Sequence, residues 1–287
     1  MRIIVILIGL ACFSVSIQLK KKAIWKVKNE APGIVFIEEN WGIDQTECTN
    51  FHWLEFLFWT SEIYGKNSPE YKAILPDTAA WKTLGHSYED YDSHYLRHPA
   101  YRNFPVVGVS YQQMQAYCQW RSDRVFEYLL VKEGFIPFKR KPHLDSIISI
   151  KALRTGKLSW IPNIEGVNLL PHYQLPTESQ WKKAAVYAEN EFKKLSKRKV
   201  ERINQMTKVN EDHPSPSVVE PNFRKEQKKC LYLLNLNMSE QLRDKTLIVG
   251  QNWLGNRELD QTDEIKSTFT KNPLTVGFRC VFEWQTR

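Results

Sequence analysis

The apolar and polar positions of the chain predict short helices and strands in an irregular order. Residues 34–37 are four consecutive apolar residues ahead of a polar turn, which predicts a strand. After Asn50, the sequence "FHWLEFLFWTSEIYG" predicts a helix that ends at Gly65. Its apolar positions at near-helical spacing are Phe51, Leu54, Phe58 and Ile63.

A second helix is expected after residue 110. Ser110 and Gln113 have the spacing of a capping box, in which each side chain satisfies a backbone amide of the first turn. The valines just before it predict a short buried strand (Val106, Val107 and Val109), and the inner face of the helix is expected to hold Ala116, Tyr117, Trp120 and Val125.

A third helix is expected to begin after Thr177, which forms a capping box with Gln180. The pattern predicts that it runs to about Met206, and its first buried turn comprises Trp181, Ala184 and Ala185. Between the second and third helices, residues 134–173 are weakly patterned, and one short helix is expected within "DSIISIKALRTGKL".

The last part of the chain predicts short strands within "CLYLLNLNMSE", "TLIVGQNW" and "TVGFRCVFEW", after a turn-rich loop that starts at about residue 207. Strands and helices do not alternate as they do in a doubly wound parallel sheet. The sequence therefore predicts an α+β protein with a single irregular mixed domain.

The first residues have the layout of an export signal, with one positive charge and then an apolar stretch that is too short for an uncleaved anchor. Cleavage after Ser16 makes residues 1–16 the signal peptide. Lipidation at Cys12 is the alternative, and it makes residues 1–11 the signal. The folded domain is expected to cover residues 23–287.

The formal net charge is +8, and residues 192–202 hold a run of basic side chains. On a helix such a run predicts a solvated face, with an acidic partner or an anionic lipid surface as alternatives. A role in binding nucleic acid is not expected, because no recognisable nucleic-acid module is present.

Beyond Cys12 the sequence holds Cys48, Cys118, Cys230 and Cys280, which allow three pairings in an oxidising compartment. Buried, unpaired thiols are the favoured interpretation.

No motif of established chemistry stands out. The chain has no P-loop and no GxGxxG, and Ser110 is better explained as a helix cap than as the nucleophile of an incomplete elbow motif. His94 and His98 have the spacing of metal ligands on a helix, but Pro99 disfavours helical geometry there. We interpret them as loop histidines.

A set of segments resembles, in order, the signature segments of the formylglycine-generating-enzyme or sulfatase-modifying-factor domain. They are "GIDQTECTNFHWLEF", "FPVVGVSYQQMQAYCQW", "LPTESQWKKAA", "CLYLLNLNMSE", "GQNW" and "VGFRC". The resemblance implies one domain with a C-type-lectin-like core, here with insertions at about residues 134–173 and 186–228. Within the superfamily, "YLRHPAYRNFPVVGVSY" looks most like gliding-motility and type IX secretion lipoproteins of the Bacteroidetes kind.

The resemblance also implies where catalytic residues would lie. Catalytic members carry a glycine-glycine-serine segment and then two cysteines, which perform a copper-dependent oxidation of a substrate cysteine. Here the segment is Gly250, Gln251, Asn252 and Trp253, and no cysteine occurs between Gly250 and Arg279. Cys280 is expected to be a packing residue. We therefore expect no catalytic residues and no catalytic cofactor.

A structural calcium ion is the one cofactor that the resemblance suggests. Asn237 and Glu240 match positions that help to bind calcium in relatives. Calcium also needs oxygen ligands from a fixed turn. The family's glycine in that turn is replaced by Leu236, which weakens this expectation.

The expected function is that of a non-catalytic, exported subunit that binds protein partners in an envelope-associated secretion or gliding-motility assembly. It would lie in the periplasm, associated with the outer membrane through a lipid anchor or through its partners. One alternative is a metal-dependent oxidase with non-cysteine ligands, although the histidines are scattered (His52, His86, His94, His98, His143, His172 and His213). The other is a glycan-binding module.

Overall fold

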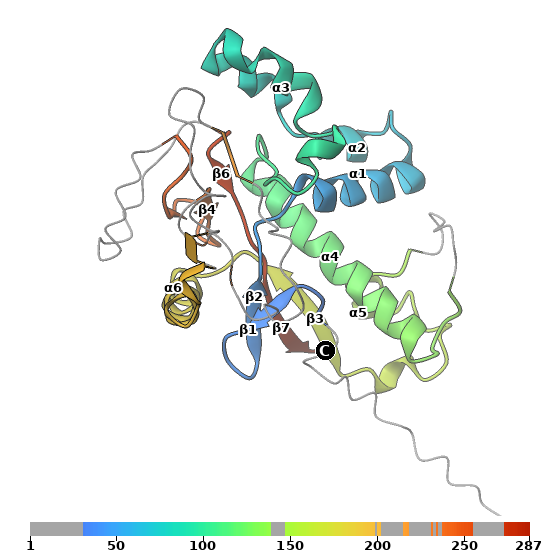
Figure 1. Ribbon diagram of the computed structural model, residues 1–287. Helices are drawn as coiled ribbons and strands as arrows, with labels where there is room; N and C mark the ends of the chain where they lie inside the picture. The colour runs from blue at the N-terminus through green and yellow to red at the C-terminus, as the bar shows by residue number, and fades with distance from the viewer. Residues whose placement is uncertain are drawn as a thin grey trace, which may run out of the picture.

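A computed structural model describes residues 31–138, 147–198, 200–201, 215–217, 231, 234, 237–254 and 273–287. Two small sheets lie at the centre and helices surround them (Figure 1). The helices are α1 (Asn50–Tyr64), α2 (Pro69–Ala73), α3 (Glu89–His94), α4 (Tyr111–Lys132), α5 (Ile150–Arg154) and α6 (Glu178–Lys193), with short 3-10 turns at Thr78–Leu84, His86–Tyr88, Pro99–Tyr101 and Ile164–Gly166. None of the described helices has the length and apolar character that crossing a membrane requires.

The larger sheet has the strand order β1-β2-β7-β3, and each neighbouring pair is antiparallel. It comprises β1 (Ile34–Phe36), β2 (Trp41–Asp44), β3 (Leu169–Gln174) and β7 (Val281–Thr286). The strand expected at residues 34–37 is confirmed as β1. The sequence pattern missed β2, which lies in the expected polar turn. β3 forms the end of the insertion expected at residues 134–173, so that segment contributes directly to the central sheet.

The smaller sheet has the order β5-β4-β6 and comprises β4 (Ser239–Gln241), β5 (Ile248–Val249) and β6 (Val276–Gly277). β4 pairs antiparallel with β5 and parallel with β6. Only Phe278, Arg279 and Cys280 separate β6 from β7, so these three residues join the two sheets. The strands expected near the C-terminus are therefore confirmed as short elements.

The helix expected after Asn50 is confirmed as α1, but the apolar positions used to predict it are not the ones that it buries. Phe51 and Phe58 are exposed, and the buried residues are Asn50, Trp53, Phe56, Leu57 and Thr60. Apolar residues occupy several sides of α1, so spacing predicts a helix there without fixing its inner face.

The start of α4 is confirmed, because Ser110 and Gln113 form the expected capping box. Tyr117 is buried, whereas Ala116 is exposed and Trp120 and Val125 are half-buried. The valines before α4 are buried but form no strand, since the only β-bridge there joins Thr49 to Pro105. Backbone amides of this segment are satisfied by separate loops, so burial occurs without strand pairing.

The helix expected from Thr177 to about Met206 is shorter than predicted. Thr177 and Gln180 form its capping box, but α6 ends at Lys193. A bend follows at Leu195, and helical residues resume after Ser196, whose carbonyl accepts from the Val200 amide at 3.1 Å. A serine at this position favours a new helix start over continuation of the old one.

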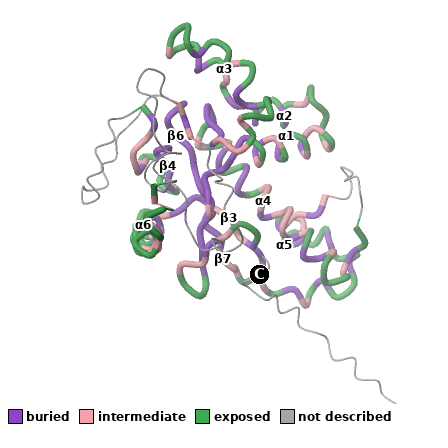
Figure 2. The backbone as a smooth tube through the Cα atoms, viewed as in Figure 1, coloured by how far each residue is buried: buried purple, intermediate pink, exposed green. Residues whose placement is uncertain are grey.

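The core surrounds the central sheet, as the buried segments in Figure 2 show. One cluster joins α1 to α4 and the sheet through Trp53, Phe56, Tyr117 and Phe278. A second cluster lies between the C-terminal half of α4 and the segment that contains α5. The short helix expected in that segment is confirmed as α5. The architecture agrees with the predicted α+β class.

Candidate functional site

A buried arginine follows, in sequence, the segment where catalytic residues would be expected. Arg279 follows β6, and its side chain is fully buried. Its Nε donates to Glu240 Oε1 at 2.6 Å, and its Nη1 donates to the carbonyl of Gln45 at 2.8 Å. Burial acts to lower the pKa of Arg279, but the carboxylates of Glu240 and Glu47 outweigh that effect and raise it. The arginine therefore stays charged and holds the β6–β7 junction against β4.

Glu47 supplies a second carboxylate to this buried cluster. Its Oε2 lies 3.6 Å from Arg279 Nη2, and neither carboxylate oxygen makes a hydrogen bond of good geometry. Weaker polar contacts with the Asn237 side chain and the Glu47 backbone lower its pKa by less than burial raises it. Burial raises its pKa from 4.5 to about 7, although Arg279 acts in the opposite direction. Glu47 is therefore a buried carboxyl group that titrates close to neutral pH.

Asn237 and Glu240, the two residues expected to bind calcium, both form hydrogen bonds with other residues of the chain. Glu240 accepts from Arg279 and, through Oε2, from Trp181 Nε1 at 2.8 Å. The Asn237 side chain accepts from the Ser217 amide at 2.8 Å and donates to the Ser217 carbonyl at 3.2 Å. A calcium ion would have to displace the guanidinium of Arg279 from Glu240. The donor set therefore fits an ion pair better than a calcium site, and calcium at this position stays a prediction.

Within the part of the chain that the structure describes, no group of three or more His, Cys, Asp or Glu side chains could hold a metal ion.

The segment from Gly250 to Trp253, which replaces the family's glycine-glycine-serine, is held by β4. Ser239 Oγ donates to the Gly250 carbonyl at 2.9 Å and accepts from Asn252 Nδ2 at 3.0 Å. Trp253 is buried, and its indole donates to the Leu274 carbonyl at 2.9 Å. Polar and aromatic side chains thus anchor this segment. Residues 255–272, where most of the gap without cysteine falls, lie outside the described residues.

The cysteines that the structure describes are buried and unpaired, as the sequence interpretation favoured. Cys118 of α4 and Cys280 at the start of β7 have their sulfurs 3.4 Å apart. Burial raises the pKa values of the Cys48 and Cys280 thiols well above their ordinary range. Protonated thiols are poor nucleophiles and poor metal ligands. Cys230 lies outside the described residues.

A second buried ion pair lies beside these thiols. Arg121 of α4 donates through Nη1 to Asp44 Oδ2 at 2.6 Å, and the same oxygen accepts from the Cys280 amide at 2.9 Å. The guanidinium also lies over the ring of Tyr173, 4.2 Å from its centroid. The end of β2 is thereby tied to α4, β3 and β7.

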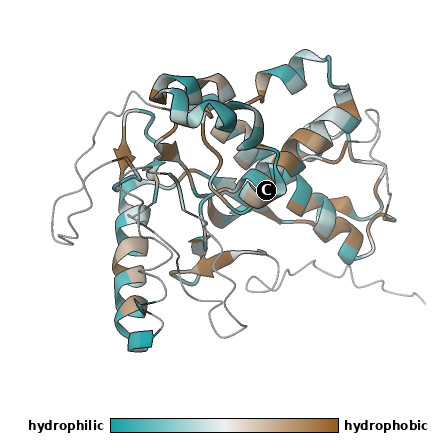
Figure 3. Ribbon diagram, turned by 45° about the horizontal axis from the view of Figure 1, so that its top comes forward, coloured by the Kyte–Doolittle hydropathy of each residue, from teal (hydrophilic) through white to brown (hydrophobic). Residues whose placement is uncertain are grey.

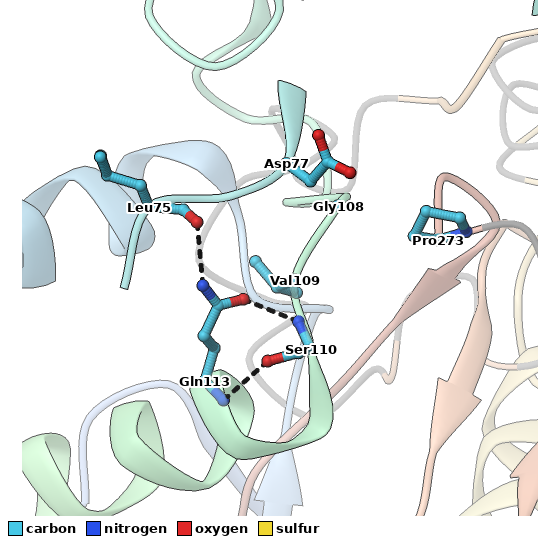
Figure 4. A pocket seen from close by; sticks show the side chains of 7 residues that line it. All are labelled: Leu75, Asp77, Gly108, Val109, Ser110, Gln113 and Pro273. Atoms are coloured by element: carbon cyan, nitrogen blue, oxygen red, sulfur yellow. Dashed lines mark hydrogen bonds between the residues drawn. The ribbon is translucent and has the colours of Figure 1, made fainter. Parts of the chain in front are cut away.

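A pocket of about 330 Å³ opens beside the start of α4, where residue 273 resumes the described chain (Figure 4). Gln113 reaches across it from α4 and donates to the carbonyls of Ala73 and Leu75 at 3.0 and 2.9 Å. The backbone of Gly108 connects two segments that line the pocket. Its carbonyl accepts from the Asp77 amide, and its amide donates to the Pro273 carbonyl. The lining is mostly backbone and aliphatic groups, and its polar side chains are Asp77, Ser110 and Gln113. Ser110 is confirmed as a helix cap.

The histidines that the structure describes are not arranged as a metal site. The rings of His94 and His98 are 6.2 Å apart. His98 lies outside the helices, as expected, and its Nδ1 accepts from the Ala100 amide. The interpretation of His94 as a loop residue is wrong, because it is the last residue of α3. His52 takes part in the capping box of α1, where its Nδ1 accepts from the Thr49 amide. Burial lowers the pKa of His52 to about 4, which keeps this acceptor neutral.

Sequence reasoning missed Glu47, Arg121 and Arg279 as members of a buried charge network. Glu47 lies in the polar segment after β2, and its neighbours in sequence give no sign of its burial. The available signal was Arg279 itself, because an arginine between the apolar residues Phe278 and Cys280 requires buried acidic partners.

A model of the family described as FGE-sulfatase, or sulfatase-modifying factor enzyme 1-like domain, matches residues 16–284. No curated protein matches the chain, and no solved structure does. The match covers α1 to α6, the buried charge network and both sheets except for the last two residues of β7.

Proposed function

Because the chain belongs to the family of sulfatase-modifying factor enzyme 1-like domains, we propose that it is a non-catalytic member that binds protein partners. One observation carries this proposal: the sequence has no cysteine between Gly250 and Arg279, where the catalytic pair of the family would lie. The oxidation that such enzymes perform needs thiolates as metal ligands and nucleophiles.

The remaining thiols support the same conclusion. Cys48, Cys118 and Cys280 are buried in the core, and the raised pKa values of Cys48 and Cys280 keep these two protonated at neutral pH. None of the three lines the pocket beside α4. A substrate cysteine would therefore meet no reactive thiol among the described residues.

The setting that we propose is the cell envelope. The apolar N-terminal stretch supports export to the periplasm, and Cys12 is the residue at which a lipid would anchor the chain to the outer membrane. Likeness to gliding-motility and type IX secretion lipoproteins supports a place in a secretion or motility assembly. On this proposal the fold also has the C-type-lectin-like core of its relatives.

The test is a pull-down of tagged full-length protein from solubilised envelope of the native organism, with metal content measured on the same sample. Recovery of secretion or motility components in fixed ratio, without a transition metal, is the expected result. A protein recovered alone with one equivalent of iron or copper would overturn the proposal in favour of a metal-dependent oxidase. Specific retention on a glycan array, without protein partners, would instead indicate a glycan-binding module.

A further inference from the structure

The outer side of α1 carries an exposed stripe of aromatic and acidic residues. Phe51, Glu55, Phe58 and Glu62 recur at helical spacing and so lie on one side of the helix. Phe51 is 48% exposed and Phe58 is 66% exposed. We call these four residues the acidic face of α1. Large rings left in water at this spacing are typical of a surface that another molecule covers.

The carboxylates of this face form no ion pair with any residue that the structure describes. Helix α1 contains no lysine or arginine, and neither Glu55 nor Glu62 forms an ion pair within the described ranges. Burial raises the pKa of Glu55, and the charge of Arg121 offsets only part of that effect. A cation placed next to Glu55 would therefore be favourable.

The same chain carries a surface of matching chemistry at the far end of α6. Phe192 is 36% exposed, and Lys197 and Arg198 follow it on the surface. Lys193 and Lys194 are already paired with Glu189 and Glu191, whereas no ion pair of Lys197 or Arg198 occurs among the residues described. We call Phe192, Lys197 and Arg198 the basic end of α6.

These two surfaces cannot meet within one molecule. Helix α6 stands on one side of the sheets and α1 on the other (Figure 1), and hydrophilic and hydrophobic segments both occur along α6 (Figure 3). Surfaces that match in charge but lie on opposite sides of a chain can pair between copies. Each protomer would then offer one surface to the copy before it and the other to the copy after it.

We propose that this chain binds a second copy of itself, with the acidic face of α1 in one protomer on the basic end of α6 in the next. Covering Phe51, Phe58 and Phe192 supplies the apolar contact. The charges fix the orientation and exclude a contact between two like surfaces. The proposal goes beyond the proposed function and does not depend on it, because a catalytic member could associate in the same way.

The test uses sedimentation velocity of the full chain in mild detergent, with two double variants. In Glu55→Lys/Glu62→Lys both surfaces are basic, and in Lys197→Glu/Arg198→Glu both are acidic. Each variant alone is expected to associate at least about a hundredfold more weakly than the unchanged chain, because like charges then face each other. Mixing the two variants is expected to restore association, since a contact between one variant and the other joins opposite charges on both of its possible pairings.

The control is Lys151→Glu/Lys157→Glu, which changes the net charge by the same amount at two exposed positions near α5. It is expected to associate as the unchanged chain does. Thermal unfolding of every variant checks that these exposed substitutions leave the fold intact. The proposal is overturned if the unchanged chain stays monomeric at about 100 μM. It is also overturned if each double variant associates normally, or if the mixture does not recover association.

Discussion

At the scale of single residues, Glu47 shows how tertiary structure changes the chemistry of a side chain. The Glu47 carboxyl group is fully buried. Its Oε2 lies 3.6 Å from the Arg279 guanidinium, and neither oxygen makes a hydrogen bond of good geometry. Its carboxylate form therefore loses hydration that the protein only partly replaces. This cost exists only when the group is ionised, so the stability of the protein should depend on pH through Glu47.

We expect Glu47→Gln to stabilise the protein at pH 8 but not at pH 4. The folded pKa of about 7 exceeds the unfolded value of 4.5, so the folded state holds the proton more tightly. In the unchanged protein, the protonated Glu47 therefore contributes stability that is fully present below pH 4.5 and is lost as the pH rises through 7. The gain in unfolding free energy should reach on the order of 3 kcal/mol at pH 8. Urea unfolding across this range measures it, with the exposed Glu39→Gln as the control. A gain that does not change with pH would contradict the raised pKa.

Cys118 and Cys280 give a second prediction at the residue scale. Their sulfurs lie 3.4 Å apart, although the residues are 162 positions apart in sequence. The structure holds both as thiols. If the chain is refolded in the presence of an oxidant, we expect these two to pair with each other rather than with Cys48, because their sulfurs are already neighbours. In the chain-entropy model, closing so long a loop would stabilise the fold by about 5 kcal/mol.

Peptide mapping without reduction measures this pairing. Cys48→Ser should leave the linked peptide unchanged, and Cys118→Ser should abolish it. A different linked pair in the refolded protein would show that the predicted pairing is wrong.

At the scale of elements, helix starts were predictable and helix faces were not. The boxes at Ser110 and Thr177 depend only on residues three positions apart, so the sequence determines them. The inner face of α1 was misassigned because apolar residues occur around the helix. The segments that α1 packs against decide which side it buries. For example, the indole of the buried Trp53 donates to the carbonyl of Ile74 at 3.1 Å.

The loop before α4 gives a prediction at this scale. Gly108 has φ +71°, and a Cβ added there would lie 2.4 Å from the carbonyl oxygen of Asp77. Gly134 has a similar φ of +76° with nothing within 4 Å. Gly108→Ala should therefore reduce the unfolding free energy by about 2 kcal/mol more than Gly134→Ala, since both carry backbone strain and only one carries a clash. Equal losses in denaturant unfolding would mean that this loop shifts without cost.

At the scale of the whole molecule, the two sheets are joined by one buried arginine. Arg279 lies between β6 and β7, and it binds Glu240 of β4 and the backbone after β2. Trp181 of α6 binds the same Glu240, so the network also fixes that helix. Such an arrangement should make the sheets unfold together rather than one after the other.

Replacing this arginine tests that coupling. Arg279→Ala leaves two buried carboxylates without their cation and should cost about 3 to 5 kcal/mol of stability. Arg279→Lys should recover little, because a single ammonium cannot reach Glu240 and the Gln45 carbonyl with the same geometry. The exposed Arg102→Ala serves as the control in the same unfolding experiment. An unfolding curve with two separate transitions in the unchanged protein would contradict the coupling.

The sequence by itself determined the features that depend on neighbouring residues: the α+β class, the capped helix starts, the short C-terminal strands and the absence of cysteine between Gly250 and Arg279. Tertiary structure decided what depends on residues far apart in the chain. It placed β2 next to β7, turned Phe51 and Phe58 outward, and gathered Glu47, Glu240 and Arg279 into one buried cluster. The physical reason is that the burial and pairing of a residue depend on the residues it contacts in the fold. Local spacing cannot identify a contact such as that between Arg279 and Gln45, which are 234 positions apart.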